Sequence, residues 1–166
     1  MSPKRKRRRA SMEAAELQES SWSPAGGMAQ FRQQQKIDRS FRSRYVDGLS
    51  FTPDHFQIEA MDALEAGHSV LVAAPTGAGK TVVGEFAVAL SLSTGSRAFY
   101  TTPIKALSNQ KFADFQKRYG EERVGLLTGD TSINPDAPII VMTTEVLRNM
   151  IYLGADLSTL SHVVLD

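Results

Sequence analysis

The chain has 166 residues, of which 42 % are hydrophobic, so it can bury the core of one ordinary domain. It contains no cysteine, which excludes a disulfide framework and a thiolate metal site and fits a reducing, cytoplasmic compartment. The formal net charge is +1, the three histidines lack metal-ligand spacing, and no apolar stretch approaches the ~20 residues that span a membrane.

Charge is distributed unevenly along the chain. Residues 4–9 read KRKRRR and hold six of the nineteen basic residues, so the remaining thirteen face eighteen acidic residues, a net charge of −5. Residues 1–30 are rich in Ser, Ala and Gly, which predicts a disordered tail. The basic block is typical of an arm attracted to polyanions, and it also matches a nuclear-localisation pattern.

The hydrophobic pattern predicts regular structure after this tail. Residues 31–50 form a helical or irregular lead-in, in which Ile37, Phe41 and Tyr45 recur at helical spacing. Helices are then predicted at residues 57–66, 81–92, 106–119 and 145–153, and strands at 69–74, 98–102, 124–127, 139–143 and 163–166. In the third helix Phe112 and Phe115 are expected to face inward, and Lys111, Lys117 and Arg118 outward. Apolar strands that alternate with helices predict an α/β domain over residues 51–166, with a parallel sheet covered on both faces.

Residues 74–81, APTGAGKT, follow a predicted strand and open a predicted helix. They match the phosphate loop G-x-x-x-x-G-K-[ST], except that Ala74 replaces the first Gly. Gly77 and Gly79 permit a nest of inward amides, and the helix N-terminus attracts the same phosphates. Lys80 suits the β- and γ-phosphates, and the Thr81 hydroxyl suits Mg²⁺. The predicted nucleotide-binding residues are Ala74, Pro75, Thr76, Gly77, Ala78, Gly79, Lys80 and Thr81.

The segment FTPDHFQIEAMDAL, residues 51–64, precedes this loop. The Gln57 amide has a paired donor and acceptor that can bind the N6/N7 edge of adenine. Phe51, six residues earlier, can stack on the ring. Taken alone, the two residues are better explained as a helix-start Gln and a core Phe.

Three further segments end predicted strands: TTPIKALSNQKF (101–112), LLTGD (126–130) and MTTEVLRNM (142–150). Ligands of parallel sheets bind at the carboxyl ends of strands, so these segments lie at the correct edge. In the first of them, the side chains suited to a sugar-phosphate backbone are Thr102, Lys105, Ser108, Asn109 and Gln110. Each segment also has a plain structural explanation, because Thr128-Gly129-Asp130 makes a turn and Thr143 or Thr144 makes a helix N-cap.

Together these stretches resemble the first RecA-like domain of superfamily 2 DExH helicases, over roughly Phe51 to Asp166. The similar group is the superkiller-type, exosome-linked RNA helicases, and within it the long actinobacterial members. The resemblance implies an ATP-dependent RNA or DNA helicase that binds ATP and Mg²⁺, with Phe51 and Gln57 recognising adenine. It implies contacts with a single-stranded nucleic acid backbone from Pro103, Lys105, Gln110, Thr128, Gly129, Thr144, Glu145 and Arg148. Because Glu145 is itself an anion, we expect it to orient its neighbours rather than to contact the backbone.

Asp166 follows the apolar run 162–165 and ends the chain. In the resembled family this strand leads into Asp-Glu-x-His, in which the Asp holds Mg²⁺ and the Glu polarises the attacking water. The resemblance therefore makes Lys80, Thr81 and Asp166 the catalytic candidates, and Thr81 and Asp166 the metal ligands. The Glu, the His and the second RecA-like domain are absent from the sequence, so we expect an N-terminal piece that is nearly inert as an ATPase.

Two other classes stay open. The first is a stand-alone P-loop nucleotide-binding or phosphotransferase domain, although a phosphotransferase needs an Arg-rich lid and only Arg123 and Arg148 follow Arg118. The second is a basic-tailed RNA-binding module without enzymatic activity.

The choice between RNA and DNA stays open as well, because contacts to the 2′-OH come from an assembled groove. No oligomer is implied.

Overall fold

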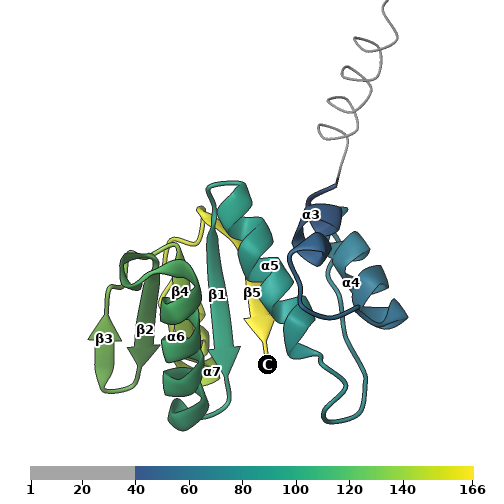
Figure 1. Cartoon of the computed structure of the whole chain (residues 1–166). Helices are drawn as coiled ribbons and strands as arrows, with labels where there is room; N and C mark the ends of the chain where they lie inside the picture. The colour runs from purple at the N-terminus through teal and green to yellow at the C-terminus, as the bar shows by residue number, and fades with distance from the viewer. Residues whose placement is uncertain (1–39) are drawn as a thin grey trace, which may run out of the picture. The chain divides into compact units, whose positions relative to one another are not determined.

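The computed structural model describes residues 40–166 (Figure 1). The predicted tail, residues 1–30, and the lead-in before residue 40 lie outside the described residues. In chain order the elements are α3 (Phe41–Asp47), α4 (His55–Glu65), α5 (Thr81–Ser93), β1 (Arg97–Thr102), α6 (Lys105–Tyr119), the 3-10 turn η1 (Glu121–Arg123), β2 (Val124–Thr128), β3 (Thr131–Ile133), β4 (Ile139–Thr143), α7 (Thr144–Tyr152) and β5 (Leu160–Leu165). The predicted α/β class is confirmed, and none of these helices is long and apolar enough to cross a membrane.

The strands form one sheet in the order β3-β2-β4-β1-β5. β1 pairs in parallel with β4 on one side and with β5 on the other, β2 pairs in parallel with β4, and β3 alone is antiparallel. The register sets Thr102 opposite Thr143, and Thr101 opposite Leu165. The carboxyl ends of β1, β4 and β5 therefore lie at one edge of the sheet, which is where the predicted binding segments begin.

Apolar side chains fill both faces of the sheet. On one face Val88 of α5 and Phe115 of α6 pack with Tyr100 of β1 in a buried cluster. On the other face Leu147 of α7 packs with Met142 of β4. Because β1 alternates its side chains between the two clusters, it is buried on both sides, as the apolar run of the strand predicts.

α3 lies in the described part of the predicted lead-in, whereas Ile37 lies outside the described residues. Phe41 and Tyr45 lie one turn apart and contact Phe86 of α5, with ring centroids 5.6 and 5.2 Å away. The first amides of α3 find an acceptor in the Glu65 carboxylate, which receives hydrogen bonds from the N–H of Phe41 at 2.6 Å and of Arg42 at 3.1 Å. α3 is thus attached to the helices α4 and α5 that flank the phosphate loop.

The strand predicted at residues 69–74 is wrong, because this segment is irregular. A strand is maintained by hydrogen bonds to a neighbour, and none of the five strands in residues 40–166 pairs with it. Leu71 in this segment is 94 % exposed. Helices cover both faces of the sheet as predicted, although at β5 the Leu165 side chain is 73 % exposed. The short strand β3 was not predicted, since three residues give no periodic signal.

The outward orientation predicted for Lys111 is also wrong. Its ammonium lies 3.2 Å from Oε1 of Glu85 on α5, and within 5.5 Å of the ring centres of Tyr100 and Phe115. Arg118 binds the other oxygen of the same carboxylate at 2.7 Å. The long lysine stem packs on the aromatic rings while its charge reaches a partner, so Lys111 joins α6 to α5.

Gly125 of β2 is expected to tolerate no side chain. An ideal Cβ there would clash with the carbonyl oxygen of Asn134 and would lie 2.9 Å from that of Ile133, both of them backbone atoms that follow β2 in the hairpin. Gly125→Ala should therefore lower the free energy of unfolding by about 1–3 kcal/mol, as overpacking does, when measured by urea denaturation. Gly129→Ala is the matched control, because a Cβ there meets nothing within 4 Å. Equal midpoints for the two variants would contradict this prediction.

Candidate nucleotide site and nucleic-acid interface

The phosphate loop has the backbone that an anion requires. Gly77 and Gly79 have φ angles of +86° and +78°, which L side chains rarely adopt. The amides of Gly77, Gly79, Lys80 and Thr81 have no acceptor among residues 40–166. They lie at or just before the N-terminus of α5, where the helix dipole favours negative charge. The loop therefore fits the phosphates of a nucleotide.

Lys80 is held against its own loop. Its ammonium donates hydrogen bonds to the carbonyl oxygens of Ala74 at 2.7 Å and Pro75 at 2.9 Å. Both acceptors are neutral, and a charged phosphate oxygen is the stronger acceptor for an ammonium group. Lys80 can therefore exchange these carbonyls for a phosphate without losing hydrogen bonds.

Gln57 is a structural residue in this fold. It is 3 % exposed; its Oε1 accepts the N–H of Asp54 at 2.8 Å and its Nε2 donates to the carbonyl of Gly79 at 2.9 Å. The side chain thus joins the first turn of α4 to the phosphate loop, as expected for a helix-start Gln. Phe51 is 48 % exposed, so its ring does not belong to the core. Adenine recognition by these two residues stays a prediction.

Asp166 directly follows β5, and its carboxylate meets a buried tyrosine. Oδ2 accepts a hydrogen bond of 2.6 Å from the Tyr100 hydroxyl, and the Asp166 N–H donates to the carbonyl of Thr101 at 3.1 Å. Burial, and then the neighbouring carboxylate, raise the pKa of Tyr100, so the hydroxyl keeps its proton and remains a donor. The ring of Tyr100 also lies against Gly84, where a Cβ would be 3.3 Å from it. Asp166 is thereby positioned beside the first turns of α5.

The oxygen donors near the loop fit Mg²⁺. Thr81 begins α5 and offers a hydroxyl, and Asp166 offers a carboxylate; both are hard ligands of the kind that this cation prefers. Residues 40–166 hold no cluster of three or more His, Cys, Asp or Glu side chains that could bind a metal by itself. The ion's other ligands would then be nucleotide oxygens and water, as is usual for Mg²⁺.

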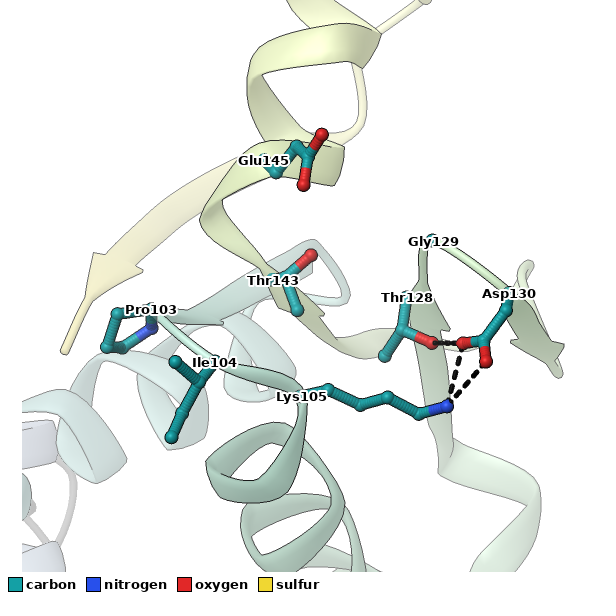
Figure 2. A pocket seen from close by; sticks show the side chains of 8 residues that line it. All are labelled: Pro103, Ile104, Lys105, Thr128, Gly129, Asp130, Thr143 and Glu145. Carbon is teal, nitrogen blue, oxygen red and sulfur yellow. Dashed lines mark hydrogen bonds and ion pairs between the residues drawn. The ribbon is translucent and has the colours of Figure 1, made fainter.

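A cleft of about 410 Å³ opens at the carboxyl ends of β1, β2 and β4 (Figure 2). The fold brings four of the predicted nucleic-acid contacts together in its lining: Pro103, Lys105, Thr128 and Gly129. Its other lining residues are Ile104, Asp130, Thr143 and Glu145. The segments come from three different strands, so the cleft exists only because the parallel register aligns their ends.

Asp130 is the residue that sequence reasoning missed in this cleft. Its two carboxylate oxygens lie 2.8 and 2.7 Å from the Lys105 ammonium, and Oδ1 accepts a hydrogen bond of 3.0 Å from the Thr128 hydroxyl (Figure 2). Hydrogen bonds from Lys105 and then Thr128 hold the pKa of Asp130 below its usual range, so it is an anion at neutral pH. In the sequence, only its position two residues after the predicted contact Thr128 indicated that Asp130 lies near this cleft.

The remaining predicted contacts lie beside the cleft or away from it. Thr144 and Arg148 line a second groove on α7 together with Leu147, Ile151 and Tyr152. Glu145 approaches Arg148, with 3.8 Å between Oε1 and Nη2, and both side chains are exposed; an orienting role for Glu145 stays a prediction. Gln110 is exposed on α6 and lines neither groove.

Thr102 and Ser108 do not fit the backbone contacts suggested for them. Both are buried, and their hydroxyl oxygens lie 2.7 Å apart in a mutual hydrogen bond. The pair fastens the start of α6 to the end of β1, because Thr102 also donates to the carbonyl of Ile104 at 3.1 Å. The two hydroxyls therefore stabilise the turn between β1 and α6, and Lys105 is the first residue of α6.

Comparison with known proteins gives the context of this geometry. "Probable helicase HelY" of Mycobacterium leprae is 62 % identical over 125 residues, which are 75 % of this chain and 14 % of that protein. "Antiviral helicase SKI2" of Saccharomyces cerevisiae is 56 % identical over 107 residues, 64 % of this chain and 8 % of that protein. "Superkiller complex protein 2" of Homo sapiens is 52 % identical over 118 residues, 70 % of this chain and 9 % of that protein.

A solved structure shares the fold. The crystal structure of a hypothetical ATP-dependent RNA helicase from Sulfolobus tokodaii superposes with a TM-score of 0.57 at 24 % identity, covering 75 % of this chain and 40 % of that chain. This likeness confirms the RecA-like α/β fold. The chain spans at most about a seventh of the length of the HelY and superkiller relatives. Residues 54–166 match the DEAD/DEAH box helicases, and the chain belongs to this family.

Proposed function

We propose that this chain provides the ATP-binding part of an ATP-dependent helicase that acts on single-stranded RNA or DNA. The observation that carries the proposal is the shared edge of the sheet: Asp166 follows β5, the Lys105 cleft follows β1, and these strands are neighbours. α5, which starts at the phosphate loop, packs on β1. A nucleotide and a nucleic acid strand would therefore bind next to the same two strands.

In this proposal the loop amides and Lys80 bind the phosphates of ATP, with Phe51 and Gln57 at the adenine. Thr81 and Asp166 would hold Mg²⁺, which when bound neutralises phosphate charge and polarises the γ-phosphate. Tyr100 keeps the Asp166 carboxylate oriented through its 2.6 Å hydrogen bond. The chain's own residues thus bind and orient the triphosphate.

The nucleic acid would bind across the cleft and along α7. Lys105 and Arg148 supply positive charge, the Thr128 and Thr144 hydroxyls supply hydrogen bonds, and Pro103 and Gly129 shape the walls. These groups suit phosphate and sugar rather than base edges, so binding would be tolerant of sequence and strongly dependent on salt. Relatives whose names include RNA helicase, such as "DExH-box ATP-dependent RNA helicase DExH9" of Arabidopsis thaliana, favour RNA.

Lys80→Ala should remove ATP binding and leave RNA binding intact. The variant loses the only ammonium of the loop, so we expect ATP affinity to fall at least about tenfold, measured by isothermal titration calorimetry with Mg²⁺ present. Affinity for a single-stranded oligouridylate should stay within about twofold, which also separates a nucleotide-binding domain from a simple RNA-binding module. Wild-type ATP affinity in this variant would refute the assignment of the loop.

Gln57→Leu should reduce both stability and ATP affinity. The change leaves the N–H of Asp54 and the carbonyl of Gly79 without their buried partner, which costs about 1–3 kcal/mol of unfolding free energy. Gln110→Leu, at an exposed position on α6, is the control for stability. A loss of ATP affinity without any change in the urea midpoint would instead indicate a base contact alone.

Lys105→Ala should weaken binding of single-stranded nucleic acid. One phosphate contact fewer should lower the salt slope of the binding constant by roughly 0.7, measured by fluorescence anisotropy between about 50 and 200 mM salt. The measurement requires a chain in which residues 4–9 are all replaced by Gln, so that the basic tail does not dominate. Lys117→Ala, an exposed lysine near the other end of α6, is the matched control. Equal effects of the two lysine variants would contradict a specific site at the cleft.

A further inference from the structure

Lys105 and Asp130, which both line the cleft, form an ion pair with each other. Among its lining residues only Lys105 carries a positive charge, and both carboxylate oxygens of Asp130 lie within 2.8 Å of its ammonium. The hydroxyls of Thr128 and Thr131 also donate to Oδ1 of Asp130, at 3.0 and 3.3 Å. Asp130 thus collects an ammonium and two hydroxyls as donors.

A phosphodiester would require the same donors. Like a carboxylate, it presents two anionic oxygens that accept hydrogen bonds from ammonium and hydroxyl groups. The Lys105–Asp130 pair is exposed to solvent, and exposed ion pairs are weak, so an incoming polyanion can open it. Glu145, the other acid of the lining, is ion-paired with Arg148 instead.

We propose that Asp130 is an affinity-setting residue that occupies the phosphate position on Lys105 and Thr128 until a nucleic acid strand displaces it. The inference rests on the proposed function, in which Lys105 binds the strand. Displacement exchanges one anion for another, so each binding step gains little and is readily reversed. A strand held in this way can be released and bound again, which movement along it requires.

Two consequences follow for Asp130→Asn, which removes the charge but keeps the size of the side chain. The Lys105 ammonium becomes available without competition, so affinity for single-stranded RNA should rise about two- to fivefold. The net charge of the cleft rises by one, so the salt slope should become steeper by roughly 0.7. The rise is unusual for a residue in the middle of a binding site, where substitutions normally weaken binding.

The test compares five full-length chains, all with residues 4–9 replaced by Gln: the unsubstituted chain, Asp130→Asn, Lys105→Ala, their double variant and the control Asp136→Asn. Binding of fluorescent oligouridylate and oligothymidylate of equal length is measured by anisotropy across a salt series. We expect Asp130→Asn to bind more tightly, Lys105→Ala to bind more weakly, and the double variant to gain nothing over Lys105→Ala. Asp136→Asn is the matched control for net charge, since Asp136 precedes β4 at the opposite edge of the sheet.

Several outcomes would overturn the inference. If Lys105→Ala weakens binding but Asp130→Asn binds no more tightly than Asp136→Asn, the role of Asp130 is refuted and the proposed function stands. If Asp130→Asn weakens binding to RNA more than to DNA, the carboxylate accepts a hydrogen bond from the ribose instead. If Lys105→Ala has no effect, the cleft does not bind the strand, so the Asp130 inference and the proposed cleft contact both fall, whereas ATP binding at the phosphate loop is tested separately by Lys80→Ala. Circular dichroism verifies the fold of each variant, and Asp130→Ser is the second neutral substitution should Asn disturb the turn.

Discussion

The parallel hydrogen bonding of β1 to β4 and to β5 is the constraint on which both candidate sites depend. It sets Thr102 beside Thr143 and Thr101 beside Leu165, so the segments that follow three strands emerge at one edge (Figure 1). A shift of one residue in either pairing would turn the alternating side chains of a strand to the opposite face and remove this alignment. Burial on both faces of β1 prevents such a shift, because the side chains that point to either face of this strand are packed in a hydrophobic cluster.

α5 and α6, whose N-termini lie at the two candidate sites, pack on one face of the sheet, and this packing fixes the distance between the sites. α5 begins with Thr81 beside the phosphate loop, and α6 begins with Lys105 in the cleft. Between them, Glu85 of α5 binds both Lys111 and Arg118 of α6. Glu85 and Lys111 are largely withdrawn from water, so salt screens their attraction less than that of a surface pair. The position of Lys105 relative to the loop is therefore fixed by charge as well as by apolar packing.

The helices and most strands could be predicted from the sequence because their signals are local. Thr81 begins α5 directly after the glycine-rich turn, as predicted, and β4 has the predicted bounds. The segment 69–74 has the same apolar texture as β4, yet it is irregular because no strand in residues 40–166 pairs with it. An apolar sequence favours extended backbone, but a strand forms only where a neighbouring strand supplies hydrogen bonds. The sequence of the segment itself does not show whether such a neighbour is present.

The site could be predicted only as far as residue chemistry goes. The sequence identifies which side chains can bind a phosphate, but whether they are available depends on tertiary partners. The Ser108 hydroxyl is already hydrogen-bonded to that of Thr102, and the Lys105 ammonium is already paired with the Asp130 carboxylate. Gln57 is also engaged by the fold, because its Oε1 accepts the N–H of Asp54 and its Nε2 donates to the loop carbonyls of Ala78 and Gly79. Loss of this side chain would therefore change the backbone of the phosphate loop, and through it the positions of the amides that would bind phosphate.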